Sequence, residues 1–135
     1  MRFLILKLDM TSNIPIYVQL RNRIVMGIGR GELKRGQGLP TVRQMADDIG
    51  VNMMTVNKAY NILKTEGYIE IDRRHGAKVN PALDTSKEFR EKVEQELELI
   101  IAESALKGID YKEFMKMCED IFNNMNGLNI VGNEA

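Results

Sequence analysis

Residues 39–63 constrain the fold most, because they predict two short helices joined by a tight turn. Thr41 is followed three residues later by Gln44, a capping-box pattern in which each side chain accepts a hydrogen bond from the other residue's backbone N–H. A helix should therefore begin just after Thr41 and end near Gly50, since glycine adopts the left-handed conformation that ends helices at little cost. Asn52 is then placed to cap a second helix. Such a pair is either the helix-turn-helix of DNA-binding proteins or an ordinary helical corner, and this stretch alone leaves both open.

The second helix of this pair has two chemically distinct faces. Its apolar residues recur at helical spacing and define one buried stripe, made of Val56, Ala59, Tyr60 and Leu63. The opposite face holds Met54, Thr55, Asn57, Lys58 and Asn61. The side chains on that face are mostly short and polar, and acidic residues are nearly absent. Such a surface is suited to contact phosphates and base edges.

The segment before the motif predicts an arm and a helix. Residues 1–12 contain the apolar run Phe3–Leu6 and predict an N-terminal arm, extended or an edge strand, whose partner the sequence does not identify. A helix should run from about Pro15 to Ile28, with caps supplied by residues 11–13. Its buried face comprises Tyr17, Leu20, Ile24 and Ile28. Three glycines should then break it, namely Gly27, Gly29 and Gly31.

After the motif the sequence predicts a β-hairpin. Gly67 ends the second helix, and residues 68–72 alternate apolar with polar side chains as a half-buried strand does. Residues 73–77 form a basic tip, and Lys78 begins the return strand. Three helices followed by a two-stranded ribbon are a winged helix-turn-helix, predicted over residues 13–80, so the fold class is mainly α with a small β-hairpin wing. A basic tip after the second motif helix favours DNA binding, because it reaches the backbone or the minor groove.

The formal net charge of zero conceals two oppositely charged regions. Residues 13–80 carry eleven Lys or Arg against six Asp or Glu, a net +5, whereas residues 81–135 carry six against twelve, a net −6. A basic body with an acidic tail is typical of a polyanion-binding module attached to a part that must avoid the polyanion. A chance distribution of charge between two solvated faces remains the alternative.

Residues 84–126 predict a separate helical region. Thr85 with Glu88 is a second capping box, and Asp110 with Glu113 caps a further helix after Gly108. The apolar positions proposed for dimerisation are Phe89, Val93, Leu97, Ile100, Ile101, Tyr111, Phe114, Met115, Cys118, Ile121 and Phe122. Two helices in about 50 residues bury too little surface alone. They should pack on a second copy across a two-fold axis, or else fold back on the winged domain. Residues 127–135 are predicted to be a disordered tail.

Other functional classes find little support. One cysteine cannot form an internal disulfide, which indicates a reduced, cytoplasmic setting, and no apolar run approaches the roughly 20 residues that cross a membrane. Lone His75 has no neighbours at metal-ligand spacing, no hydroxyl has a base at nucleophile spacing, and no glycine-rich phosphate loop is present. We therefore expect that the protein is not an enzyme and that it binds no cofactor and no metal ion.

Six short blocks stand in order between residues 14 and 79: PIYVQL at 15–20, GELKRG at 31–36, LPTVR at 39–43, GVN at 50–52, TVNKAY at 55–60 and LKTEGYI at 63–69. Together they resemble the DNA-binding domain of the GntR family of bacterial transcription regulators. The short two-helix tail resembles the YtrA-like subfamily. That resemblance implies a dimeric repressor, often of transporter operons, without the large metabolite-binding domain of other branches.

Carried over by position, the resemblance implies a set of contact residues. Arg43 matches the family's arginine at the start of the second helix, and the wing tip is matched by His75 and Gly76. The full candidate DNA-binding set is Thr41, Arg43, Asn52, Met53, Met54, Thr55, Asn57, Lys58, Arg73, Arg74, His75 and Gly76. Met53-Met54 replaces the subfamily's usual Pro-Asn, so a target sequence does not transfer.

The expected function is therefore that of a sequence-specific transcription regulator. It would bind double-stranded DNA as a homodimer on a pseudo-palindromic operator. The alternative is a winged-helix adaptor whose acidic tail binds proteins and for which DNA binding is incidental. The sequence identifies no small-molecule effector.

Overall fold

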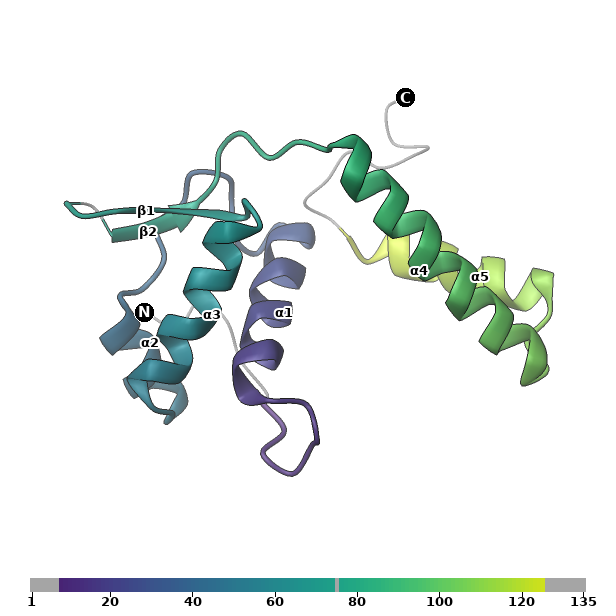
Figure 1. Ribbon diagram of the computed structural model, residues 1–135, viewed down its shortest axis with the longest axis horizontal. Helices are drawn as coiled ribbons and strands as arrows, with labels where there is room; N and C mark the ends of the chain where they lie inside the picture. Colours follow the sequence, from purple (N-terminus) through teal and green to yellow (C-terminus); the bar gives the residue numbers. More distant parts are fainter. Residues whose placement is uncertain (1–7, 75, 126–135) are drawn as a thin grey trace. The chain divides into compact units, whose positions relative to one another are not determined.

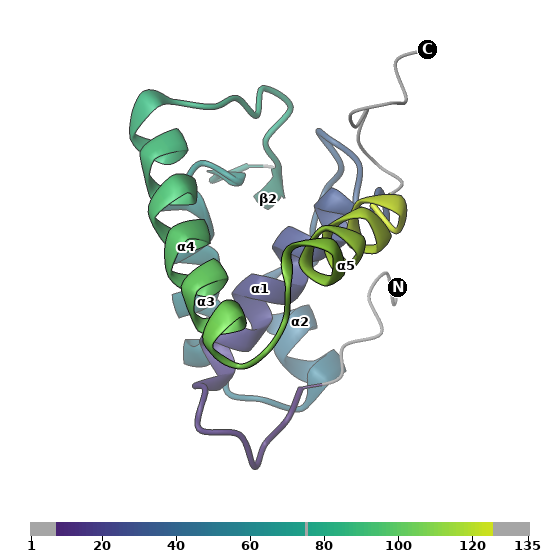
Figure 2. The same cartoon turned by 90° about the vertical axis from the view of Figure 1, so that its right-hand side faces the viewer.

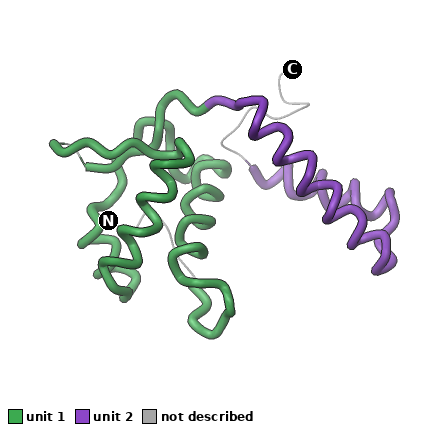
Figure 3. The backbone as a smooth tube through the Cα atoms, viewed as in Figure 1, with its two compact units in different colours: residues 1–83, 126–129 green, residues 84–125, 130–135 purple. Residues whose placement is uncertain are grey.

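The computed structural model describes residues 8–74 and 76–125. These residues form two compact units, one extending to Leu83 and one running from Asp84 to Met125 (Figure 3). The predicted apolar arm at Phe3–Leu6 and the predicted disordered tail at 127–135 lie outside the described residues, as does His75.

The first unit contains three helices and a β-hairpin. Its elements are α1 (Ile16–Gly29), α2 (Val42–Ile49), α3 (Met53–Thr65), β1 (Ile69–Asp72) and β2 (Gly76–Val79) (Figure 1). α3 packs against α1, α2 and β1, and the two strands pair antiparallel. This order and packing confirm the predicted winged helix-turn-helix, mainly α with a small β-hairpin wing.

Every helix and strand of the first unit contributes to one core. The buried apolar residues are Leu20, Ile24, Ile28, Leu33, Met45, Ala46, Val56, Ala59, Tyr60, Leu63, Ile69, Ala77 and Val79. The predicted buried stripe of α3 is confirmed, and so is that of α1, in which Tyr17 is half-buried. Full burial of a large apolar side chain contributes roughly 1.5–3 kcal/mol, so this core holds the unit together within one chain.

The wing has a third backbone segment that the sequence did not predict. Residues 36–39 run along β2: the N–H of Gly36 donates to the carbonyl of Val79, and the N–H of Leu39 donates to that of Ala77, both at 2.8 Å. The prediction that Ala77 belongs to the hairpin tip is wrong, because Ala77 is buried within β2. Its small side chain fits against the core while Lys78 beside it points to solvent, so the tip is shorter than expected.

The ends of α1 also differ from the prediction. Pro15 is the N-cap and makes no side-chain cap bond; residues 11–13 therefore do not cap the helix. Instead the Gln19 side chain accepts from the N–H of Asp9 at 2.8 Å and donates to the carbonyls of Asp9 and Ile14. Gly27 and Gly29 lie inside the helix, and the chain turns only at Gly31, which has a φ of 82°.

The second unit is a helical hairpin of α4 (Lys87–Leu106) and α5 (Tyr111–Asn123) (Figure 2). The cap at Asp110 is confirmed, since its carboxylate accepts from the N–H of Glu113 at 2.9 Å. The cap predicted at Thr85 is wrong by one residue. Ser86 has the extended backbone and accepts from the N–H of Phe89 at 3.1 Å, while the Thr85 hydroxyl donates to the Ser86 carbonyl instead.

Neither helix of the second unit contains a fully buried residue. Phe114 and Cys118 are half-buried, whereas the other residues predicted for dimerisation are exposed. Their exposed fractions run from 38% at Val93 to 80% at Tyr111. Within the described part of the chain, no helix is both long and apolar enough to cross a membrane.

Candidate nucleic-acid interface

The two motif helices are held by caps that use predicted contact residues. The Thr41 hydroxyl accepts from the N–H of Gln44 and the Gln44 side chain accepts from the N–H of Thr41, both at 3.0 Å, so the capping box is confirmed. Gly50 adopts the left-handed conformation with a φ of 74°. The Asn52 carboxamide oxygen then accepts from the N–H of Met54 at 2.7 Å. Thr41 and Asn52 therefore position the starts of α2 and α3, whatever else they contact.

A buried tyrosine fixes α3 against the start of α2. The Tyr60 hydroxyl donates to the carbonyl of Pro40 at 2.7 Å, and the side chain is 2% exposed. Burial raises the pKa of Tyr60 well above its usual value, so the hydroxyl keeps its proton and remains a donor. Pro40 directly precedes the cap Thr41, and Leu39 before it is bonded to β2. This one hydrogen bond thus connects the second motif helix to the segment that joins α2 and the wing.

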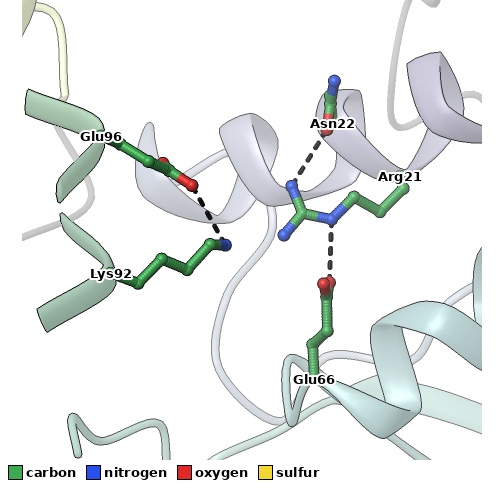
Figure 4. A network of polar contacts seen from close by, with 5 residues as sticks. All are labelled: Arg21, Asn22, Glu66, Lys92 and Glu96. Atoms are coloured by element: carbon green, nitrogen blue, oxygen red, sulfur yellow. Dashed lines mark hydrogen bonds and ion pairs between the residues drawn. The ribbon is translucent and has the colours of Figure 1, made fainter. Parts of the chain in front are cut away.

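The far end of α3 is fixed to α1 by an arginine. Arg21 donates from Nε to the carboxylate of Glu66 at 2.9 Å and from Nη1 to the side-chain oxygen of Asn22 at 3.0 Å (Figure 4). Its guanidinium also lies 5.4 Å from the centroid of the Tyr68 ring. Such a partly exposed ion pair is worth under about 1 kcal/mol, so its role is orientation more than stability.

The outward face of α3 presents the predicted recognition surface. Met54 is 78% exposed and Met53 is 42% exposed, while Thr55 is half-buried. Asn57 and Asn61 are exposed and make no hydrogen bond to any described residue. No acidic residue lies anywhere in α3. The face therefore offers amide and thioether groups to a partner without repelling phosphates.

Lys58 has a partner that the sequence did not reveal. Its Nζ lies 4.1 Å from the centroid of the Tyr17 ring on α1, a cation–π contact. Tyr17 was expected only as a core residue. The contact joins residues 41 positions apart, and no local pattern predicts which side chains of α1 and α3 meet.

The basic residues predicted for phosphate contact lie on exposed edges of the unit. Arg43 is exposed at the start of α2 and makes no ion pair with the residues described. Arg73 and Arg74 are exposed in the turn between β1 and β2, where the N–H of Arg74 donates to the Asp72 carboxylate at 2.7 Å. Gly76 lies in β2 with a φ of 77°, a conformation that favours glycine at this position.

A surface groove in the first unit carries the opposite charge. It has a volume of about 410 Å³ and is lined by Gly38, Leu39, Pro40, Gln44, Asp47 and Asp48. The two exposed carboxylates at 47 and 48 make this groove unfavourable for phosphate. Among residues 8–74 and 76–125, no three His, Cys, Asp or Glu side chains cluster as metal ligands.

A helix-turn-helix with an acid-free outer face, followed by a β-hairpin with arginines at its tip, defines the winged helix-turn-helix class of DNA-binding module. The family model described as "Bacterial regulatory proteins, gntR family" matches residues 16–79, and the chain belongs to this family. It is therefore a DNA-binding transcription regulator and not an enzyme.

Relatives place the chain in the YtrA-like branch of the family. It is 27% identical over 124 residues to the transcriptional repressor YtrA of Bacillus subtilis, covering 90% of this chain and 95% of the relative. The structure of YtrA from Sulfolobus acidocaldarius, a GntR-family transcription factor, is 37% identical with a TM-score of 0.63, covering 73% of this chain and 99% of that one. The match to the regulator Rv1152 of Mycobacterium tuberculosis is 37% identical over 71 residues; it spans 53% of this chain and 59% of that protein.

Proposed function

We propose that this regulator is a repressor that binds a pseudo-palindromic operator as a homodimer in the cytoplasm. The observation that carries the proposal is the outer face of α3, which is exposed, polar and free of acid while its opposite face is buried in the core. A helix presented in this way enters the major groove and contacts base edges with its first turns. The name of the B. subtilis relative, a transcriptional repressor, supports the sign of regulation.

We assign the contacts in two groups. Arg43, Lys58, Arg73 and Arg74 are exposed cations and contact phosphates, which fixes register without reading sequence. Met53, Met54, Thr55 and Asn57 occupy the first turns of α3 and contact base edges. His75 and Gly76 are further proposed DNA contacts.

The exposed apolar face of the second unit supports dimerisation. Apolar side chains along both helices remain 38% to 87% exposed, among them Leu97, Ile101, Ile121 and Phe122. Large exposed apolar patches mark protein–protein interaction sites. A second copy supplies an identical apolar face, and a two-fold axis makes the pairing self-complementary. The acidic charge of residues 81–135 opposes contact of this region with DNA phosphates, which leaves it free to join the two copies.

The test of function is selection of bound sequences from random duplexes by the full-length protein, followed by titration of the selected duplex at several salt concentrations. We expect a two-fold symmetric consensus and an affinity that falls steeply with salt. The variant Arg43→Gln should lower the log–log salt slope by about 1.8, because the homodimer loses two phosphate contacts at about 0.9 each. Lys112→Gln removes the same single charge from the second unit and should leave the slope unchanged.

The adaptor hypothesis predicts that the double variant Thr55→Ala with Asn57→Ala keeps its biological activity. If α3 reads bases, the same double variant should instead abolish selective operator binding. Unchanged binding and unchanged repression in that variant, or a salt-independent affinity of the parent protein, would refute the proposed function.

A further inference from the structure

The outer face of α3 has a central stripe of uncharged side chains. Met54, Asn57 and Asn61 follow one another at spacings of three and four residues, so they lie along one side of the helix. All three are exposed, and that side is opposite the buried stripe that includes Val56 and Leu63. Because neither asparagine is bonded to a described residue, both carboxamides are available to a ligand.

The chemistry of this stripe matches one kind of base pair. In the major groove, adenine offers an acceptor and a donor that a carboxamide pairs with bidentately, and thymine offers a methyl group that suits apolar contact. Guanine is read mainly by Arg or Lys, and cytosine by an acidic side chain. α3 contains no arginine and no acidic residue, so its only candidates for a bidentate guanine contact are Lys58 and Lys64. Lys64 is in the last turn, beyond the part of a recognition helix that contacts bases.

Lys58 is held to one side of the stripe. Its Nζ lies over the Tyr17 ring at 4.1 Å from the centroid, and Tyr17 belongs to α1. A cation over an aromatic face is stabilised there by roughly 0.5–1 kcal/mol at an exposed site. The contact draws the ammonium group toward α1, away from the stripe, while leaving it exposed enough to meet a phosphate.

We propose that Met54, Asn57 and Asn61 read A·T base pairs in the operator half-site, and that Tyr17 is a positioning residue that keeps Lys58 on the phosphate backbone and away from guanine. The inference rests on the proposed DNA-binding function and adds to it the base composition that α3 selects. Any bidentate contact to guanine in the operator then comes from residues outside α3.

The first experiment compares sequences selected from random duplexes by the full-length parent and by Asn57→Ala and Asn61→Ala. Each variant should lose preference at one base pair per half-site, and the preference lost should be for A·T. In direct titrations the parent should discriminate against G·C at that position by about 5- to 150-fold, and the variant should not. A lost preference for G·C, or no lost preference in either variant, would overturn the inference.

The second experiment separates the ring of Tyr17 from its hydroxyl. Tyr17→Phe keeps the ring under Lys58 and should select the same sequences as the parent. Tyr17→Leu keeps an apolar side chain but removes the ring, so the freed Lys58 should raise the relative affinity for G·C substitutions next to the stripe by about two- to fivefold for each half-site. Identical selections by the parent and by both variants would contradict a positioning role.

The variant Lys58→Gln tests the assignment of Lys58 to the phosphate backbone without a substitution in α1. We expect it to weaken binding about equally for all duplexes and to lower the salt slope by about 1.8, about 0.9 for each copy in the dimer, with the base preference unchanged. A changed base preference would show that Lys58 reads bases and would refute its assignment to the backbone. If no duplex binds any of these proteins, the proposed function itself fails; if duplexes bind but the stripe selects G·C, only this inference fails.

Discussion

Helices in both units of this protein have apolar faces, and the exposure of those faces differs between the units. In the first unit the apolar stripe of α3 is buried, with Val56, Ala59 and Leu63 at 0% exposure. In the second unit, Leu97 of α4 and Ile121 of α5 are 43% and 56% exposed. The first unit completes its core with its own helices and strands; the second has only two helices and buries no residue of either fully.

This difference shows that helical periodicity predicts a buried face without identifying what buries it. In α3 the covering elements are α1, α2 and β1 of the same chain. For α4 and α5 we propose a second copy, because a dimer makes the two faces cover each other. The following predictions use substitutions in the two units to test that contrast.

The largest effect is expected from a charge placed on the apolar face of α4. Leu97→Glu would bury an unpaired carboxylate in the proposed dimer, once from each copy. Such a buried charge costs about 3–5 kcal/mol, so self-association should weaken by about 1,000-fold or more. Sedimentation velocity over a range of concentrations measures it.

The matched control for this variant is Gln95→Glu, which adds the same charge to α4 two residues away. It should sediment like the parent. Equal loss of association in both variants would indicate a non-specific charge effect, and no loss in Leu97→Glu would contradict the proposed interface.

The next prediction compares one truncation in each unit. Leu63→Ala should lower the free energy of unfolding by about 2–5 kcal/mol, the cost of a cavity in a closed core, independently of protein concentration. Leu97→Ala should instead have a destabilising effect that depends on concentration, since the contacts it loses are proposed to lie between copies. Denaturation at several concentrations distinguishes the two, and concentration-independent curves for both variants would argue for a face covered within one chain.

A smaller effect is expected at the hydroxyl of Tyr60, inside the first unit. Tyr60→Phe should cost about 1–2 kcal/mol, because the carbonyl of Pro40 loses its donor. Burial raises the pKa of Tyr60 above the usual 10.0, so the folded state keeps the proton after the unfolded state has released it. The stabilisation by the tyrosine is therefore complete below about pH 10 and decreases above it, by up to about 1.4 kcal/mol per pH unit. The difference between parent and variant should shrink as pH rises past 10, as measured by denaturation; a constant difference would contradict this account.

The smallest effect distinguishes two neighbouring cap candidates in the second unit. Ser86→Ala should reduce stability by about 1 kcal/mol, since Ser86 accepts from the N–H of Phe89 at the start of α4. Thr85→Ala should change it by a few tenths at most. Helix content and thermal unfolding of the two variants measure this difference. A larger loss of stability in Thr85→Ala than in Ser86→Ala would show that Thr85 is the cap, as the sequence predicted.

The parts of the fold that depend on local sequence were predictable. The capping box at Thr41 and Gln44, the turn at Gly50 and the buried stripe of α3 all follow from side-chain chemistry within a few residues. The cap at Thr85 was misplaced because Ser86 offers the same hydroxyl one position later, and sequence alone does not distinguish which backbone is extended.

Contacts between distant segments were not predictable in this way. The pairing of residues 36–39 with β2, the Tyr60 bond to Pro40 and the position of Lys58 over Tyr17 each join parts of the chain that only the tertiary fold brings together. For the site, the sequence indicated which residues are exposed on α3. It also indicated that Thr41 and Asn52 cap the two motif helices, but not that Tyr17 holds Lys58.

The most direct test of the central claim is the stoichiometry of the complex with its operator. The mass of the complex is measured by sedimentation or light scattering for the full selected palindrome and for a duplex carrying one half-site. The account predicts two chains on the palindrome, at an affinity far above that for the half-site, and loss of this advantage in Leu97→Glu. One chain per palindrome, bound no more tightly than the half-site, would contradict it.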